Sequence, residues 1–334
     1  MTLAPPASFA PPGWLVNAHL QSIVPSLRLR RPLVARRARR MLACAETQVV
    51  ECGDGVRLLG HYSSQTAAGR PQARDLVIVL HGWEGSADSM YVLSLGSYLF
   101  DLGCDIYRLN FRDHGPSHHL NEEIFHSCRL DEVVGAVGAI QRAIPHSRTT
   151  LAGFSLGGNF ALRVAARAPA AGITLERAIA ICPVLRPHST MDVLEEGPFV
   201  YHQYFIGKWK QSLQLKQRIF PKRYDFAPIL ASRSIKEMTR IMVEQYSEFP
   251  TLDAYLSGYA IVGDRLAQLA VPSHILLSLD DPIIPARDLQ DVARSSHLQI
   301  AAIPHGGHCG FMESFTRESY ADRQVAKYMG LSGL

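Results

Sequence analysis

Short apolar runs alternate with longer segments of helical periodicity over most of the chain. Runs such as LVIVL at 76–80 and TTLAGF at 149–154 suit strands that are buried on both faces of a sheet. Residues 89–102, 127–144 and 156–169 have the length and the spacing of apolar positions expected of helices. Strands that alternate with helices in this way predict a parallel sheet covered by helices on both faces. The other runs that we expect to be strands are 104–111, 177–184, 274–279 and 298–304.

Two regions depart from this alternation. Residues 46–63 predict a β-hairpin that turns at Gly53-Asp54-Gly55. Residues 187–260 are rich in aromatic and basic residues and contain no apolar run of the parallel-strand type. We expect this segment to be a helical cap, inserted between the strand near Cys182 and the strand near Leu277, of the kind that closes over an active site. The alternative is a helical extension that packs away from the site.

The pattern divides the chain into a Pro/Arg-rich leader at 1–43, an α/β core at 44–186 and 261–334, and the cap at 187–260. The length of 334 residues fits one large α/β domain with an insertion. A composition of 47% hydrophobic and 19% charged residues is ordinary for a globular protein with a sizeable core. The net charge of +4 is too small to indicate a nucleic-acid partner, and we expect none.

Basic residues gather in the leader, where RLRRPLVARRARR occupies 28–40. We interpret the run chiefly as a solvated arm that lays its arginine stems along the protein. The alternative is weak contact with an anionic membrane surface. The seven arginines of the run are Arg28, Arg30, Arg31, Arg36, Arg37, Arg39 and Arg40.

The cysteines show neither CxxC pairs nor the spacing of a disulfide framework, which favours a reducing compartment. The first residues, MTLAPPASFAPPGW, lack the basic and apolar regions of a signal peptide. No apolar run reaches the length of a membrane span. We therefore expect a cytoplasmic protein, of open oligomeric state. The six cysteines are Cys44, Cys52, Cys104, Cys128, Cys182 and Cys309.

The clearest chemical signal is LAGFSLGGNF at 151–160, where Ser155 stands between two glycines at an expected junction of strand and helix. Gly-x-Ser-x-Gly in this position is typical of a nucleophile elbow, a sharp turn that exposes the serine hydroxyl above a sheet. Gly153 and Gly157 leave room for the strand and helix to cross closely. The alternative is an ordinary Gly/Ser-rich loop. An elbow also requires an acid and a histidine downstream and an oxyanion loop upstream.

An acid and a histidine do follow, in the order that this fold requires. The run ILLSL enters Asp280-Asp281, and LQIAAIP enters a glycine-rich loop with His305 and His308. All four residues therefore leave the carboxyl ends of strands, which is the edge where open α/β sheets bind ligands. Because a serine needs a base and the base an orienting acid, we predict one residue of each pair to be catalytic.

We choose His308 as the base because flanking glycines let its backbone approach Ser155. We choose Asp281 as the acid because Pro282 follows it and makes a rigid start to the next helix. His305 would then only pack against its neighbours or form a hydrogen bond. Asp280 would cap the loop or form a hydrogen bond with it. Either choice has a structural alternative, because strand-end aspartates often cap helices and loop histidines often lie on the surface.

An oxyanion loop is expected at His81-Gly82-Trp83, directly after the run at 76–80. An oxyanion hole needs preorganised N–H donors, of which one follows the nucleophile and the other comes from this loop. We predict the N–H groups of Leu156 and Trp83. The indole of Trp83 is then free to line the acyl pocket, and large cap rings would keep that pocket short. The predicted substrate-binding residues are Trp83, Phe199 and Tyr204.

A histidine cluster in RDHGPSHHLNEEIFHS at 112–127 raises the question of a metal site. Its spacing matches no common zinc pattern, and hydrolysis by a serine triad needs no metal. We therefore expect neither a metal nor a cofactor, and interpret the segment as a polar loop whose side chains satisfy one another. The histidines are His114, His118, His119 and His126.

Together these stretches resemble the YheT-like family of the α/β-hydrolase superfamily, which includes the animal alpha/beta-hydrolase-domain proteins one to three. The resemblance implies Ser155 as nucleophile, Asp281 as acid and His308 as base, with esterase or lipase-like activity on acyl esters. Trp83 and Asp113 differ from the residues usual in the group, and the animal members carry a membrane anchor, so their phospholipid substrates are not carried over. The stretches are NAHLQSIVP, HGWEGS, NFRDHG, GFSLGGN, DDPIIP and GGHCGF.

The predicted fold is thus an α/β-hydrolase with an inserted helical cap. The predicted function is a serine carboxylesterase that cleaves small-molecule esters, of short to medium acyl chain, through an acyl-enzyme intermediate. A thioesterase or an amidase would use the same triad, and a ligand-binding protein would use the same scaffold without chemistry. A complete set of serine, acid and histidine favours the enzyme, because a binding protein has no chemical need to keep it.

Overall fold

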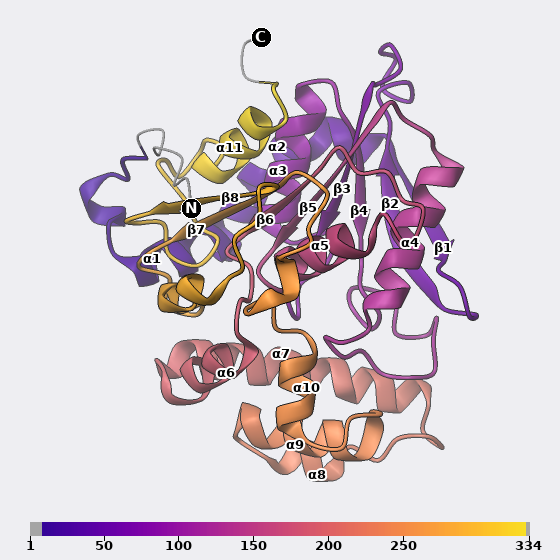
Figure 1. Cartoon of the computed structure of the whole chain (residues 1–334), viewed down its shortest axis with the longest axis vertical. Coiled ribbons are helices and arrows are strands. Elements are labelled where there is room, and N and C mark those ends of the chain that lie inside the picture. Colours follow the sequence, from indigo (N-terminus) through magenta and orange to yellow (C-terminus); the bar gives the residue numbers. More distant parts are fainter. Residues whose placement is uncertain (1–8, 332–334) are drawn as a thin grey trace.

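Eight strands form one sheet in the order β1-β2-β4-β3-β5-β6-β7-β8 in the computed structural model, which describes residues 9–331 (Figure 1). The hairpin β1–β2 and the pair β2–β4 are antiparallel, and the remaining pairs are parallel. This confirms the predicted α/β-hydrolase fold. The strands are β1 (Ala45–Glu51), β2 (Arg57–Ser63), β3 (Asp75–Leu80), β4 (Asp105–Leu109), β5 (Arg148–Phe154), β6 (Arg177–Ile181), β7 (Ser273–Ser278) and β8 (Leu298–Ile303).

Each run that was expected to be a strand contains one. The central strand β3 is buried at all six positions, which explains why its sequence is a continuous apolar run without alternation. Leu80 pairs with Gly153, and Phe154 pairs with Ile181. Because β3, β5 and β6 are parallel and in this register, the residues that follow them meet at one edge of the sheet.

Helices cover both faces of the sheet (Figure 1). On one face, α3 (Met90–Asp101) contacts α2 (Arg31–Ala43) and α11 (Tyr320–Tyr328). On the other face, α4 (Leu130–Ala143) packs against α5 (Leu156–Arg167). The 3-10 turns are Gly13–Leu15, Val24–Ser26, Arg28–Arg30, Asp264–Leu266 and Ala286–Asp291.

The arginine-rich segment is a packed helix rather than the solvated arm that the sequence suggested. On α2, Val34, Ala38 and Met41 are buried at helical spacing, so this side of the helix lies against the core. Arg30, just before this helix, also forms hydrogen bonds within the fold, since it donates to the carbonyl groups of Pro25 and Phe315. Residues 1–8 of the expected leader lie outside the described residues.

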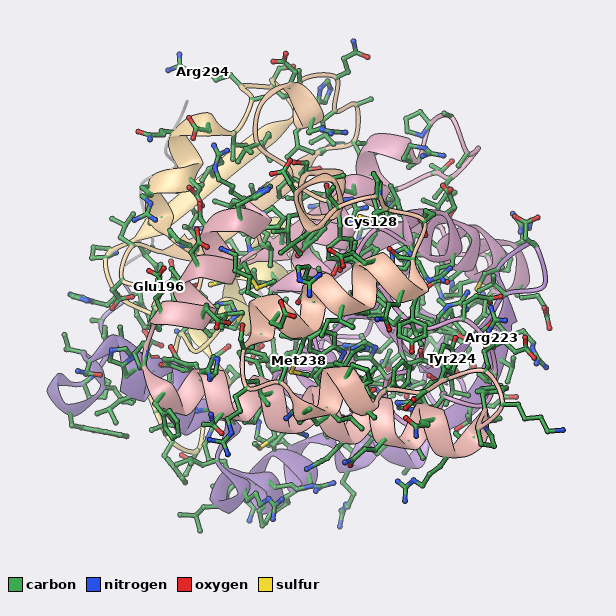
Figure 2. The ribbon with its side chains drawn as sticks, turned by 90° about the horizontal axis from the view of Figure 1, so that it is seen from below. Cys128, Glu196, Arg223, Tyr224, Met238 and Arg294 are labelled. Carbon is green, nitrogen blue, oxygen red and sulfur yellow. The ribbon has the colours of Figure 1, made fainter. Side chains whose placement is uncertain are left out.

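A layer of helices lies between β6 and β7 in the sequence and below the sheet in space (Figure 1). Seen from below, these helices cross in front of the core (Figure 2). They occupy the segment that was expected to form the cap, and we use that name for residues 187–258. Its helices are α6 (Pro187–Glu196), α7 (Phe199–Ile219), α8 (Ala227–Ala231), α9 (Ile235–Tyr246) and α10 (Leu252–Gly258). In the described part of the chain, no helix combines the length and the apolarity needed to span a bilayer.

A buried ion pair joins the cap to the core. Lys216 of α7 donates to Asp113 Oδ1 at 2.8 Å, and the two side chains are 1% and 7% exposed. The same ammonium group donates to the carbonyl of Asn121 at 2.6 Å, while Asp113 Oδ2 accepts the Phe125 N–H at 2.9 Å. Both charges are therefore paired and hydrogen-bonded, which is the condition for burying them.

Candidate active site

Ser155 lies at the turn between β5 and α5 and has a strained backbone, with φ 52° and ψ −119°. A positive φ at a residue other than glycine is uncommon and is maintained here by the strand before it and the helix after it. The Ser155 N–H donates to the carbonyl of Ile181 on β6 at 2.8 Å. This is the backbone geometry of the elbow that the sequence predicted, with the serine at the carboxyl edge of the sheet.

Asp281 and His308 come together at the same edge. His308 Nδ1 donates to Asp281 Oδ2 at 2.9 Å, and the carboxylate is fully buried. Asp281 Oδ1 also accepts the N–H groups of Ile283 and Ile284 at 2.8 and 2.9 Å. These donors fix the carboxylate and leave one of its oxygens directed at the imidazole.

The neighbouring pair makes different contacts. Asp280 accepts the Gly307 N–H at 3.0 Å and lies 3.3 Å from Nδ1 of His305. Asp280 thus holds the glycine-rich loop, and His305 is partnered on the exposed side of that loop. Their positions are those of supporting residues, as the sequence interpretation assigned them.

The histidine loop also rests on the N-terminal helix α1 (Ala18–Ile23), a support that the sequence interpretation missed. The His308 N–H donates to Ser22 Oγ at 2.8 Å. The buried Gln21 side chain donates to the Met312 carbonyl at 2.9 Å and accepts the Met312 N–H at 2.8 Å. The stretch NAHLQS therefore fixes the loop that carries His308. The match of this stretch to the family motif was the signal that could have indicated it.

The end of β6 links the serine to the histidine loop. The Ile181 carbonyl accepts the Ser155 N–H, and the same oxygen lies 3.8 Å from Sγ of Cys309, the residue after His308. Three chain segments that are far apart in sequence thus meet at one strand end. The serine and the loop that carries His308 therefore lie at the same strand end.

Two opposing effects act on the charge of His308. Burial is the largest single effect and lowers the pKa of His308, but the Asp281 carboxylate and the Cys309 sulfur together outweigh burial through their charges and hydrogen bonds. The net pKa lies well above the ordinary value of an imidazole. Asp281 therefore makes His308 a stronger base than it would be alone.

The predicted oxyanion loop lies beside the serine. A Cβ placed on Gly82 would be 3.2 Å from Ser155 Cβ, so the loop backbone and the nucleophile approach closely. Leu156 is the first residue of α5, where an N–H has no partner within the helix. The Trp83 N–H has no acceptor among the described residues. Both predicted donors are thus available at the same edge.

Two buried histidines hold this loop. His81 Nε2 accepts the Phe111 N–H at 3.1 Å, so the neutral ring donates from Nδ1 to the Gly82 carbonyl at 2.7 Å. His114 Nε2 accepts the Glu84 N–H at 3.2 Å. Burial lowers the pKa of His81 to about 4. Burial, followed by electrostatic repulsion from His81, lowers the pKa of His114 well below its ordinary value. Both rings therefore stay neutral with fixed tautomers, and they bind the residues on either side of Trp83, Gly82 and Glu84.

The histidines of 112–127 do not converge on a shared site. His114 holds the oxyanion loop, and His118 Nε2 pairs with Ser212 Oγ of the cap at 2.9 Å. His126 lies in the wall of the cavity described next. The histidines of this polar loop therefore lie at three separate places and make different contacts.

A largely apolar cavity of about 80 Å³ lies between Ser155 and the cap. The Trp83 indole stacks on Phe205 with ring centroids 5.3 Å apart and meets Trp209 edge-on at 5.4 Å. These three rings form one wall of the cavity. The rest of the lining is Phe125, His126, Ser127, Leu156, Val184, Pro187, Thr190, Met191, Leu194, Ile235, Thr239, Met242, Tyr255, Tyr259 and Ile283.

Two of the predicted substrate-binding residues do not reach this cavity. Phe199 is 75% exposed and Tyr204 is 52% exposed, and neither is in the lining. Successive residues of a helix turn by about 100°, so Phe205 and Trp209 share a face of α7 that Tyr204 leaves. The prediction was wrong for Phe199 and Tyr204 because the rotation of α7 over the core is not visible in its sequence.

The sheet, the elbow and the cap together define a class of protein. The family model described as the alpha/beta hydrolase fold matches residues 75–315, and the chain belongs to this family.

Similar proteins agree with this class. The YheT protein of Escherichia coli (strain K12), which is named as an esterase, is 24% identical over 92% of this chain and 87% of its own length. Phospholipase ABHD3 of Bos taurus is 19% identical over 96% of this chain and 78% of its own length. These relatives confirm the resemblance to the YheT-like group.

A solved structure shows the same fold. The serine hydrolase CCSP0084 from a Cycloclasticus bacterium that degrades polyaromatic hydrocarbons aligns with a TM-score of 0.57 at 16% identity. The alignment covers 87% of this chain and all of that one.

Proposed function

We propose that this protein is a serine hydrolase that cleaves carboxylic esters of small molecules through an acyl-enzyme intermediate. The observation that carries the proposal is the Asp281–His308 pair, held at the strand edge where the strained Ser155 borders an apolar cavity. Membership of the alpha/beta hydrolase family, and relatives named as an esterase and a phospholipase, support the class of reaction. Hydrolysis of p-nitrophenyl esters by the purified protein tests it.

In this mechanism Ser155 Oγ attacks the ester carbonyl while His308 Nε2 accepts its proton. Asp281 holds the imidazole through Nδ1 and stabilises the imidazolium that forms. The N–H groups of Trp83 and Leu156 bind the negative oxygen of the tetrahedral intermediate. His308 then donates the proton to the departing alcohol, which leaves the acyl group on Ser155. Water, activated by His308 in the same way, releases the acid.

The size of the cavity favours acyl groups of short to medium length. We expect kcat/KM to rise from acetyl to about butyryl or hexanoyl esters and then to fall. Each methylene that enters the cavity contributes roughly 0.8 kcal/mol, or about fourfold in kcat/KM, until the wall is reached.

Trp83→Leu is expected to move this optimum to longer chains, because the indole is part of the wall. The measurement is kcat/KM for p-nitrophenyl esters of two to twelve carbons. Phe199→Leu is the matched control, since this ring is on the exterior of the cap and its loss should leave the optimum unchanged. An optimum that stays in place in a folded Trp83→Leu variant would contradict the assignment of the cavity as the acyl pocket.

The pH profile should reflect the state of His308. Only the neutral imidazole accepts the serine proton, and its pKa is raised above the ordinary value of 6.5. Activity is therefore expected to be lost at acid pH and to rise with pH through a midpoint above 6.5. Measurement of kcat/KM from pH 5 to pH 10 tests this, and His305→Gln should give the same curve. A rising limb centred below pH 6 would contradict the assigned base.

A further inference from the structure

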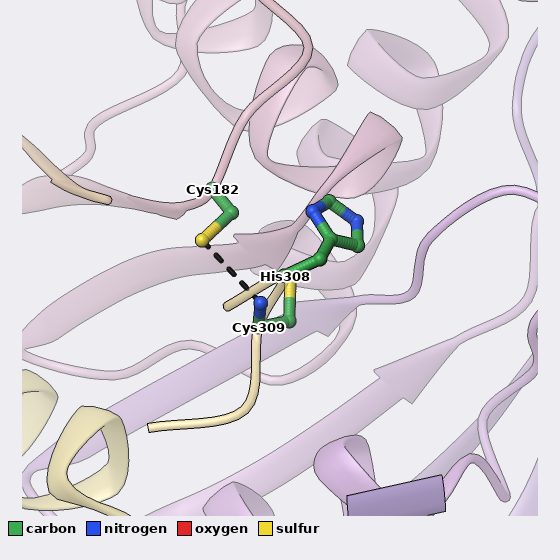
Figure 3. Close-up of side chains that lie close together, drawn as sticks. All are labelled: Cys182, His308 and Cys309. Atoms are coloured by element: carbon green, nitrogen blue, oxygen red, sulfur yellow. Dashed lines mark hydrogen bonds between the residues drawn. The ribbon is translucent and has the colours of Figure 1, made fainter. Parts of the chain in front are cut away.

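Two cysteines lie beside the proposed general base. Cys182 directly follows β6, and Cys309 directly follows His308. The sulfur atoms of the two cysteines and a ring nitrogen of His308 are all within 4.8 Å of one another (Figure 3). The Cys309 N–H points at Cys182 Sγ, at a distance of 3.4 Å. Both cysteines are free thiols in this structure.

The two thiols have unequal chemistry. Burial raises the pKa of Cys182 well above its ordinary value. Burial acts in the same direction on Cys309, but the thiol of Cys182 and the charge of His308 outweigh it and lower the pKa of Cys309 to about 6. A thiolate beside a second, protonated thiol is the arrangement of an attacking cysteine and a resolving cysteine.

Three other cysteines differ from Cys309 in the acidity of their thiols. Burial raises the pKa of Cys52, Cys104 and Cys128 to about 12, so these thiols stay protonated and unreactive. Cys182 is fully buried, whereas Cys309 is partly accessible, so a small oxidant reaches the attacking sulfur first.

We propose that Cys309 and Cys182 form a reversible disulfide in response to peroxide and that this bond switches the hydrolase off. The Cys309 thiolate attacks hydrogen peroxide, the O–O bond breaks, and a sulfenic acid and hydroxide result. The Cys182 sulfur then attacks the Cys309 sulfur, the S–O bond breaks, and the proton of Cys182 leaves with the oxygen as water. The hydroxide takes up the proton that Cys309 released on ionisation. In total, two thiols and one peroxide give one disulfide and two waters, with the thiols oxidised by two electrons.

Formation of the Cys182–Cys309 disulfide should displace His308. A disulfide requires the sulfur atoms to be about 2.05 Å apart, so Cys309 must move toward Cys182. His308 is covalently joined to Cys309, and its position depends on the 2.9 Å contact with Asp281. A misplacement of about 1 Å in catalytic geometry costs about 10²-fold in rate. The loss of activity rests on the proposed function, whereas formation of the bond does not.

A zinc ion on the same three side chains is the rival explanation of the cluster. A metal ligand must be deprotonated, and burial keeps the Cys182 thiol protonated. Nδ1 of His308 is also already engaged by Asp281. These contacts favour the disulfide over a zinc site, and the peroxide experiment described next distinguishes them.

The full chain is treated with hydrogen peroxide, its free thiols are blocked with N-ethylmaleimide, and its peptides are mapped without reduction. We expect a linked peptide that joins Cys182 to Cys309, together with a fall of about 10²-fold in p-nitrophenyl ester hydrolysis that dithiothreitol reverses. Cys182→Ser should keep its initial activity, and both Cys182→Ser and Cys309→Ser should lose the linked peptide. Cys44→Ser is the matched control and should still form the link.

Three results would overturn the proposal. They are oxidation without a Cys182–Cys309 link, a link that leaves activity unchanged, and inhibition by zinc that EDTA reverses without any link. Absence of ester hydrolysis before oxidation, with the link still formed, would instead count against the proposed function and leave the disulfide in place.

Discussion

Asp281→Asn is expected to lower kcat about 10⁴-fold, whereas Asp280→Asn should retain most of the activity. Loss of the orienting acid of a serine triad typically costs this much, because the imidazole then holds the wrong tautomer. Asp281 accepts Nδ1–H of His308 from a fully buried position, whereas Asp280 contacts the Gly307 N–H and His305. The two residues are adjacent, so the comparison isolates the contact with His308.

Steady-state hydrolysis of p-nitrophenyl butyrate by both variants is the measurement. The circular dichroism of each variant should match that of the parent, because neither change alters side-chain volume by much. A crippled Asp280→Asn beside a nearly active Asp281→Asn would reverse the assignment of the acid.

The second large effect concerns stability. Lys216→Met is expected to lower the free energy of unfolding by about 3–5 kcal/mol, because it leaves the Asp113 carboxylate buried without its countercharge. Burial already raises the pKa of Asp113 and lowers the pKa of Lys216, so each charge depends on the other. Urea unfolding at pH 7 measures the change.

A double variant tests the cause. Asp113 has a φ of 57°, a conformation that glycine adopts without cost, so Asp113→Gly fits the backbone. Adding it to Lys216→Met removes the unpaired charge and should restore most of the lost stability. Lys236→Met is the control, since Lys236 and Asp192 are more than half exposed and such a pair contributes about 0–1 kcal/mol. A Lys216→Met variant as stable as Lys236→Met would contradict the role of the buried pair.

The strands that follow β2 were predictable because each lies in a largely apolar run. The β1–β2 hairpin was predictable from its turn, where Gly53, Asp54 and Gly55 all have positive φ. The helix α2 was missed although Val34, Ala38 and Met41 follow the spacing i, i+4, i+7. The five arginines of α2 obscured that narrow apolar face.

The candidate triad was predictable for a local reason. Ser155, Asp281 and His308 each follow a strand, and parallel strands bring their carboxyl ends to one edge. The support of His308 by Ser22 spans 286 residues of sequence, and no local pattern reports such a contact. The prediction of Phe199 and Tyr204 as substrate-binding residues failed for a related reason, since the rotation of a helix about its axis is set by tertiary packing.

Intact-mass spectrometry after treatment with a fluorophosphonate probe tests most directly whether Ser155 is a nucleophile. The parent should gain the mass of one phosphonyl group, and peptide mapping should place that group on Ser155. Ser155→Ala should gain none, while Asp280→Asn should label like the parent. An adduct on Ser155→Ala equal to the adduct on the parent would show that the reactive group lies elsewhere, and the proposed serine hydrolase would be wrong.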